Sequence, residues 1–451
     1  MKELAAAELG HLLVFAFLFC VGAFMAAPVI TDVTMAALCP GQDQCSLAIY
    51  LTGLQQAVTA LGALVVTPVV GNLSDRYGRK ALLALPATVS IVPLAILAFN
   101  QAKAYFYAYY VAKMLTSMVS EGTMMCLSLA YVADKVPEAG RGAAFGVFSG
   151  VCTAGFVAGT IAARFLSVSS TFQVATLAAV AAAVYMRAFV RETVGGASLL
   201  RDEEASRRLL CAPPPAPTRR RRGSRRSGRR RRCQRWPRFL LAGHVYVLNL
   251  ELNSTSDYLL NACDPLCSST FKRAAVVTFF HALGETGLQT ALLYFLKAQF
   301  HYTKNQYANL LLIIGVTGSF SQLTVMPLLA PKLGEQRLLI VALLGSCVHV
   351  PYLAASCVIL SILVGPCIRS IVSKKVGPSE QGMVQGCITG ISSTASVISP
   401  LVFTPLTAWF LSENAPFNFK GFSLACAGFA TLVALTLSIN MRPAEVQPDT
   451  K

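Results

Sequence analysis

Charged residues are scarce in this chain of 451 residues: Asp, Glu, Lys and Arg together make up 13% of it, whereas soluble globular proteins carry about 25%. Hydrophobic residues make up 55% of the chain, and apolar stretches of about membrane-span length recur along nearly all of it. This composition excludes a typical soluble enzyme, a disordered protein and a β-barrel. The sequence therefore predicts an all-α, polytopic membrane protein.

Signatures of ATP hydrolysis and of membrane enzymes are missing too. The chain has no phosphate-binding P-loop, no nucleophile elbow and no metalloprotease helix. Cys263 and Cys267 lack the second cysteine pair or the histidine pair that a zinc site needs. We therefore expect no enzyme activity, no catalytic residue, no metal site and no cofactor.

The net charge of +17 has a local origin, because residues 219–238 contain 12 arginines. These arginines lie with a proline-rich stretch inside residues 196–270, a composition that buries no core and predicts a disordered cytoplasmic linker. We expect this linker to bind anionic lipid, at about 1 kcal/mol for each basic residue near the surface, and not nucleic acid. The alternative is that part of it comes from a recent insertion or a gene-model error.

Apolar segments long enough to cross a hydrocarbon core about 30 Å thick divide the chain into two halves. They lie at 11–30, 47–71, 81–99, 104–133, 143–163 and 172–191, and then at 274–297, 306–330, 338–368, 384–411 and 419–440. This layout predicts a six-helix bundle at 1–195, the linker at 196–270, a second helix bundle at 271–441 and a tail at 442–451.

The placement of lysine and arginine predicts the orientation of the spans. On an alternating path that begins inside, the basic residues beyond the arginine run favour cytoplasmic over external segments by 20 to 5. Both termini are therefore expected in the cytoplasm. The compartment stays open between the plasma membrane and an endomembrane such as the vacuole.

One apolar segment, residues 338–368, is too short for two ordinary spans. A single span there would place Arg369, Lys374 and Lys375 outside, against the charge rule. We therefore expect two abbreviated helices, the ninth and tenth of the chain, broken near residues 349–351. The alternative is one long, tilted helix.

The loop after the second span reads G-N-L-S-D-R-Y-G-R-K over residues 71–80. Its two glycines permit close helix approach and a tight turn, and its carboxylate suits a positive helix end or a basic side chain of the other half. We expect this loop to act as a cytoplasmic latch. The alternative, for its basic residues alone, is that they only follow the positive-inside rule for cytoplasmic loops. The latch residues are Gly71, Asp75, Arg76, Gly78, Arg79 and Lys80.

This loop matches at every position the signature G-x-L-A/S-D-R/K-x-G-R-K/R that the major facilitator superfamily carries between its second and third helices. Asp134, Arg141 and Gly142, which follow the fourth span, resemble the tetracycline/proton antiporter branch. Further phrases resemble plant members of the hippocampus-abundant-transcript-like, or tetracycline-transporter-like, group; they lie at 30–37, 45–53 and 415–419. The likeness covers residues 1–195 and 270–440.

The resemblance implies two six-helix bundles and a secondary active transporter that carries a small organic solute by alternating access, with proton coupling. The antiporter signature of the fifth span departs from the family pattern, since Gly155 and Gly159 are followed by Thr160 and two alanines in place of glycines. Antiport, symport and uniport therefore stay open. The rival hypothesis is a membrane receptor or scaffold that kept the fold without transporting.

An internal repeat supports two related halves. Arg141 and three glycines at 142, 146 and 150 recur 240 residues later as Gln381 and glycines at 382, 386 and 390. Small residues four positions apart line one helix face and let two helices pack closely. A weaker echo of the first loop lies at 331–334, without the carboxylate.

Polar side chains inside the spans are candidates for a solute or proton site, because intramembrane charges are costly and usually face a cavity or a partner. Burial is expected to raise the pKa of Glu285 or Glu121 toward neutrality and so allow proton transfer. The alternative is that these residues only form hydrogen bonds between helices. The full set is Glu285, Glu121, His281, Gln289, Lys113 and Gln55.

Two of the 14 cysteines, Cys39 and Cys45, fall in the first external loop. They are candidates for a disulfide, and two free thiols are the alternative. The expected partners of the protein are thus a small-molecule solute, protons, the lipid bilayer and, at the arginine-rich linker, anionic lipid.

Overall fold

The computed structural model describes residues 2–38, 46–193, 269–300, 304–347, 359–377, 380–411, 416 and 419–439. These residues form only helices and turns, and they belong to one compact unit made of Met1–Leu199 and Ser269–Lys451. The predicted break at residues 349–351, residues 196–268 of the predicted linker, Cys39 and Cys45 lie outside the described residues.

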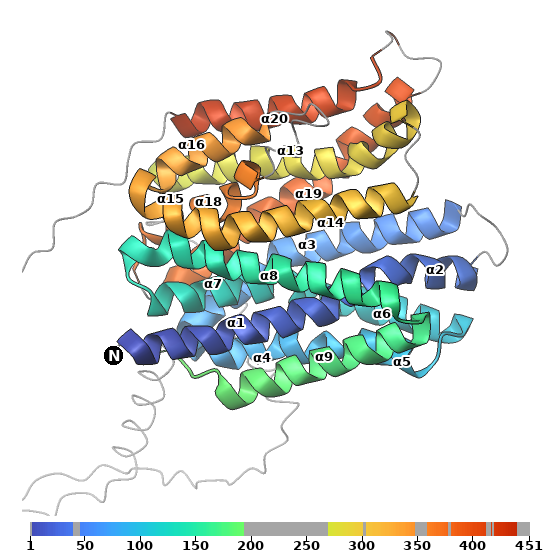
Figure 1. Ribbon diagram of the computed structural model, residues 1–451, viewed down its shortest axis with the longest axis horizontal. Coiled ribbons are helices and arrows are strands. Elements are labelled where there is room, and N and C mark those ends of the chain that lie inside the picture. Colours follow the sequence, from blue (N-terminus) through green and yellow to red (C-terminus); the bar gives the residue numbers. More distant parts are fainter. Residues whose placement is uncertain are drawn as a thin grey trace, which may run out of the picture. The chain divides into compact units, whose positions relative to one another are not determined.

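The first half of the chain is a succession of long helices, several of them interrupted (Figure 1). The α1–α2 and α4–α5 breaks each precede a proline, Pro28 and Pro93, whose ring displaces the carbonyl four residues earlier. In order, the elements are α1 (Lys2–Met25), α2 (Ala27–Leu38), α3 (Ser46–Tyr77), α4 (Arg79–Val89), α5 (Ile91–Phe99), α6 (Lys103–Ser120), α7 (Thr123–Lys135), the 3-10 turn η1 (Glu138–Gly140), α8 (Arg141–Phe165) and α9 (Val168–Phe189).

The second half repeats this plan with shorter pieces in its middle. Between α14 and α15 the helix widens into one π-helical turn, η2, a feature that often marks functional sites. The elements are α13 (Ser269–Phe300), α14 (Lys304–Phe320), η2 (Ser321–Val325), α15 (Met326–Leu333), α16 (Glu335–Ser346), α18 (Val364–Ser373), α19 (Gln381–Leu411) and α20 (Phe422–Ile439).

Two separate helices lie in the described part of the compressed segment, α16 with 12 residues and α18 with 10, and α18 belongs to the apolar helix Ile359–Ser373. Residues 348–358, which lie between them in the sequence, are outside the described residues, so the predicted abbreviation of the two helices stays a prediction. The helices α16 and α18 pack side by side, and Glu335 at the start of α16 contacts Lys374 just beyond the end of α18. The two helices are therefore antiparallel, and the single long helix is wrong.

The all-helical membrane fold is confirmed. Within the described residues, eight helices are long and apolar enough to cross a membrane, and Ile359–Ser373 forms a shorter apolar helix. Each half also has its own hydrophobic core: one cluster lies entirely within residues 274–435, and two others lie within residues 12–190. No described core cluster contains residues of both halves.

Glycine stripes bring the two halves together. On α8, Gly146 faces Met326 and Gly150 faces Leu323, both in the second half. On α19, Gly382 faces Gly71 and Gly386 faces the backbone at Thr67 and Pro68 of α3. The sequence repeat thus marks two symmetry-related contacts, α8 against η2 and α15, and α19 against α3.

Replacing Gly386 by alanine should destabilise the protein. An added Cβ would lie 2.8 Å from the carbonyl oxygen of Thr67, and backbone must shift to accept it, at about 1–3 kcal/mol. Gly365→Ala is the matched control, since nothing lies within 4 Å of a Cβ there. Thermal unfolding of both purified variants measures the difference; equal melting temperatures would contradict close packing of α19 on α3.

Candidate functional site: polar contacts between the two halves

Asp75, in the last turn of α3, contacts the beginning of α19 in the other half. Its Oδ1 accepts a hydrogen bond from the backbone N–H of Gly382 (3.0 Å), and its Oδ2 accepts one from that of Met383 (2.8 Å). The side chain is only 6% exposed. The carboxylate thus satisfies two orphan donors of α19 and faces the positive end of its dipole.

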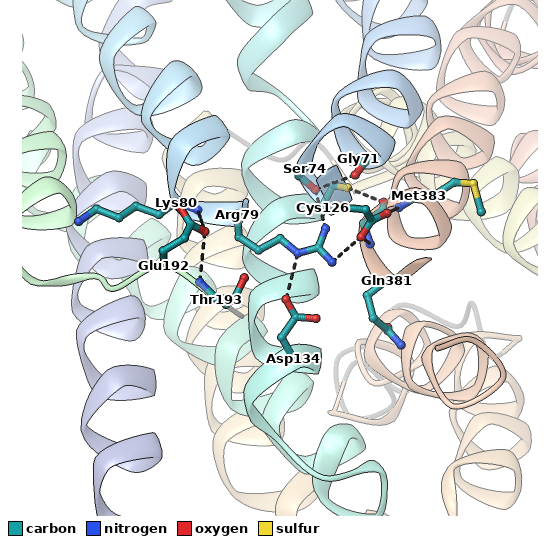
Figure 2. Close-up of polar contacts among 12 residues, drawn as sticks. Gly71, Ser74, Arg79, Lys80, Cys126, Asp134, Glu192, Thr193, Gln381 and Met383 are labelled. Carbon is teal, nitrogen blue, oxygen red and sulfur yellow. Dashed lines mark hydrogen bonds and ion pairs between the residues drawn. The ribbon is translucent and has the colours of Figure 1, made fainter. Parts of the chain in front are cut away.

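Arg79, at the start of α4, also binds this carboxylate, and its guanidinium lies between Ser74 and Asp134 (Figure 2). All three nitrogens of its guanidinium are engaged: Nη2 pairs with Asp75, Nε with Oδ2 of Asp134 (3.0 Å) and Nη1 with Oγ of Ser74 (2.6 Å). The side chain is 3% exposed. The guanidinium of Arg79 and the positive end of α19 together balance the carboxylates of Asp75 and Asp134. Removing the guanidinium would therefore leave negative charge without its ion-pair partner.

Both glycines of the loop have structural reasons. A Cβ on Gly71 would collide with the carbonyl of Gly382. Gly78 has φ 97°, in the left-handed region, and a Cβ there would lie 2.6 Å from the carboxyl carbon of Glu192. Glu192 in turn accepts hydrogen bonds from the backbone N–H groups of Lys80 (3.0 Å) and Ala81 (3.2 Å), at the start of α4.

The other predicted loop residues also make contacts at this end of the helices, here named the Asp75 end. Lys80 donates from Nζ to the carbonyl of Arg187, in the last turn of α9 (2.9 Å), and Arg76 is half-buried and has a partner. Arg141, at the start of α8, donates from Nη1 to the carbonyl of Ser373, where α18 ends (2.8 Å). Arg141 therefore joins the two halves as Asp75 does.

The second half contains the same ion pair with its charges exchanged. Gly334 (φ 78°, ψ 150°) has nearly the conformation of Gly78 (φ 97°, ψ 152°), and each opens a helix, with Glu335 in the place of Arg79. Lys374 lies 240 residues after Asp134, the offset of the sequence repeat. Its Nζ is 2.6 Å from Oε1 of Glu335, so each half joins its third and fourth spans by one such pair.

Glu335 also reaches the other half. A Cβ on Gly142, in the first turn of α8, would lie 2.7 Å from its Oε1. The Oγ of Ser370 donates a hydrogen bond to the same oxygen (3.2 Å). A carboxylate thus lies beside the first turn of both repeat helices: Asp75 at α19 and Glu335 at α8.

The candidate residues inside the spans form two groups. On α6, Nζ of Lys113 lies 3.6 Å from Oε1 of Glu121. The expected burial of Glu121 is wrong: its side chain is 56% exposed, because the helix breaks at Gly122, where φ is 77°. Gly122 was the available signal, but one isolated glycine in an apolar run does not by itself predict a break.

On α13, Nε2 of Gln289 donates to Oε1 of Glu285 (3.4 Å), and His281 lies one turn before Glu285. The Nδ1 atom of His281 is buried and has no hydrogen-bond partner in the described structure. Among the described residues, no hydrogen bond or ion pair joins this group to Lys113, Glu121 or Gln55. The residues of each group thus lie close to one another along their own helix, but no described hydrogen bond or ion pair joins the two groups.

Some polar residues of the interface were not predicted. Gln322, in η2, accepts from Thr153 of α8 (3.0 Å) and donates to the carbonyl of Ile362 (3.3 Å). Arg369 lies inside α18, one turn before its end, and not in a loop as expected. The available signal was the predicted shortness of the ninth and tenth spans, which leaves a nominal loop residue within a helix.

Comparisons with known proteins agree with this fold. The family model described as Major Facilitator Superfamily matches residues 12–252. Tetracycline resistance protein, class H, of Pasteurella multocida is 20% identical and covers 78% of each chain. Hippocampus abundant transcript 1 protein of Mus musculus is 21% identical over 78% of this chain, which spans 65% of that protein.

Two solved structures share the fold at low identity. The human organic anion transporter MFSD10 (TETRAN) superposes with a TM-score of 0.66 at 16% identity, covering 96% of this chain and 99% of its own. The proton:xylose symporter XylE superposes with a TM-score of 0.67 at 13% identity, covering 98% and 96%. Both matches extend over both halves of the chain.

Exchanging the charges of the second ion pair tests its equivalence to the first. Lys374→Glu should destabilise the protein by about 1–3 kcal/mol, because it places a second partly buried carboxylate next to that of Glu335. Adding Glu335→Lys should restore most of the loss, since the first half accommodates this charge order. Lys375→Glu, at an exposed neighbouring position, is the control for net charge. Melting temperatures measure the cycle; a double variant no better than Lys374→Glu alone would contradict the equivalence.

Proposed function

The chain belongs to the major facilitator superfamily, and on that premise we propose that it is a secondary transporter that carries a small organic solute by alternating access. The observation that carries the proposal is the bond between Asp75 and the N-terminus of α19, which closes the Asp75 end between two separately packed halves. Alternating access needs such a contact to form and break as the halves rock about a central site.

The basic residues around the Asp75 end support a cytoplasmic position for it by the positive-inside rule. They include Lys80, Lys135, Arg187, Lys332, Arg337 and Lys375. On this orientation the structure is closed to the cytoplasm, both termini are cytoplasmic, and the arginine-rich linker faces the anionic leaflet that it is proposed to bind.

Proton coupling is proposed for the α13 group. His281 has an unpartnered buried Nδ1 and lies one turn from Glu285, so a proton can be held by the imidazole or shared with the carboxylate. The Lys113–Glu121 pair on α6 is the second candidate, since its 3.6 Å contact can open when one partner changes protonation. A structural neighbour, XylE, is described as a proton:xylose symporter, which supports testing protons first.

Glu285→Gln should abolish solute uptake driven by a pH gradient and leave solute exchange intact, because the amide cannot carry a proton. Purified protein in liposomes, assayed with a solute panel with and without a pH gradient, measures both. Arg337→Gln, which removes an exposed charge outside this group, is the control. Unchanged gradient dependence in Glu285→Gln would reject this assignment. No flux of any solute by the wild type would reject transport itself and favour the receptor or scaffold.

Asp75→Asn should open the cytoplasmic side. The charge-assisted contact is worth about 1.5–3 kcal/mol, so its loss shifts the equilibrium roughly 10- to 150-fold toward the inward-open state. Turnover should fall much more than folding or membrane delivery.

Accessibility of a cysteine introduced near residue 75 to a membrane-impermeant reagent measures this shift. Arg337→Gln, an exposed charge change at the same end, should leave labelling at the wild-type rate. Equal labelling of Asp75→Asn and wild type would show that Asp75 is not a latch.

A further inference from the structure

Arg369 is a cation in α18 without a carboxylate partner among the described residues. Its Nη1 donates to Oε1 of Gln385 and to Oγ1 of Thr389, each at 3.2 Å. Nε2 of Gln385 donates back to the carbonyl of Arg369 (3.3 Å). These neutral partners on α19 hold one side of the guanidinium and leave its charge uncompensated.

The other two nitrogens of the guanidinium have no described hydrogen-bond partner. Neither Nε nor Nη2 of Arg369 makes a hydrogen bond to any described residue. In Arg79 these same two nitrogens bind carboxylates, Nε at Asp134 and Nη2 at Asp75. Nε and Nη2 form the edge with which arginine grips a carboxylate or phosphate by two parallel bonds. Nε and Nη2 of Arg369 thus have no described partner, whereas the same two atoms of Arg79 bind carboxylates.

The surroundings of Arg369 come from both halves. Thr389, its partner, lies against Gly122 of the first half, where a Cβ would be 3.0 Å from the threonine methyl and 2.9 Å from Oγ1 of Thr67. Oγ1 of Thr67 and Oγ1 of Thr123 are buried and have no hydrogen-bond partner in the described structure. Unpaired buried hydroxyls are unfavourable, and an unpaired cation inside a span is more so.

We propose that Arg369 binds the carboxylate, or a similar oxyanion group, of the transported solute between the two halves, so that the solute is an organic anion. This inference rests on the proposed transport function and names its substrate class. An anion at Nε and Nη2 neutralises the cation. A purely structural arginine would need only the bonds to Gln385 and Thr389.

Binding to the purified full-length protein tests the proposal without requiring flux. The probes are benzoate, succinate and phenyl phosphate, with benzamide, succinamide and phenol as their neutral counterparts and chloride as the inorganic anion. We expect at least one organic anion to raise the melting temperature of the wild type and of Arg337→Gln, the matched control with an exposed arginine. The neutral counterparts and chloride should give no comparable shift.

The variants at the site separate binding from structure. Arg369→Gln should lose the stabilisation, and Arg369→Lys should need at least about tenfold more of the anion, because a point charge replaces the fork. If Arg369→Gln does not fold, Arg369→Lys and the anion–amide comparison decide the matter. Equal stabilisation by the amides, by chloride alone, or in Arg369→Gln would overturn the proposal.

Liposome flux distinguishes the two hypotheses. Flux of an organic anion that is lost in Arg369→Gln and kept in Arg337→Gln is expected. Flux of neutral solutes that persists in Arg369→Gln would reject the anion site and leave transport standing. Anion binding that depends on Arg369, without flux of any solute, would instead reject transport and leave the site.

Discussion

The bond between the Asp75 carboxylate and the first turn of α19 sets the requirements for the residues around it. Two backbone N–H groups must approach one carboxylate, so α3 and α19 must come close, and Gly71 and Gly382 permit this. A buried carboxylate also needs a cation, which Arg79 provides while pairing with Asp134. Because each half has its own core clusters, the proposed opening of this contact would leave the packing inside each half in place.

The two halves repeat a plan but use different chemistry. Arg79 pairs with Asp134 in the first half, and Glu335 with Lys374 in the second, so the tie between third and fourth spans survives with exchanged charges. In the second half, the ion-paired residue Glu335 is itself the carboxylate that lies beside α8. In the first half, the ion-paired residue is Arg79, so a separate carboxylate, Asp75, contacts α19. The echo at 331–334 can therefore lack that acid and still bring a carboxylate to the facing helix.

Local patterns predicted what depends on local sequence. Apolar run lengths indicated the helices, including the two separate ones in the compressed segment, and glycine spacing indicated the close helix contacts. Glu192, Gln322 and Arg369 were not predicted as site residues, because their importance depends on which helix ends meet in space. The exposure of Glu121 was missed for a related reason: Gly122 breaks the helix where Thr67 and Thr389 crowd it, a contact between segments far apart in sequence.

The proposed latch and the proposed anion site both involve α19. Along α19, Gly382 contacts Asp75, while Gln385 and Thr389 contact Arg369, and seven residues of helix span about 10 Å. Cys126 of α7 contacts the same helix, since its Sγ donates to the carbonyl of Gly382. Because Gln385 and Thr389 lie on the same helix as Gly382, any movement of α19 that breaks the contact with Asp75 also moves the described partners of Arg369.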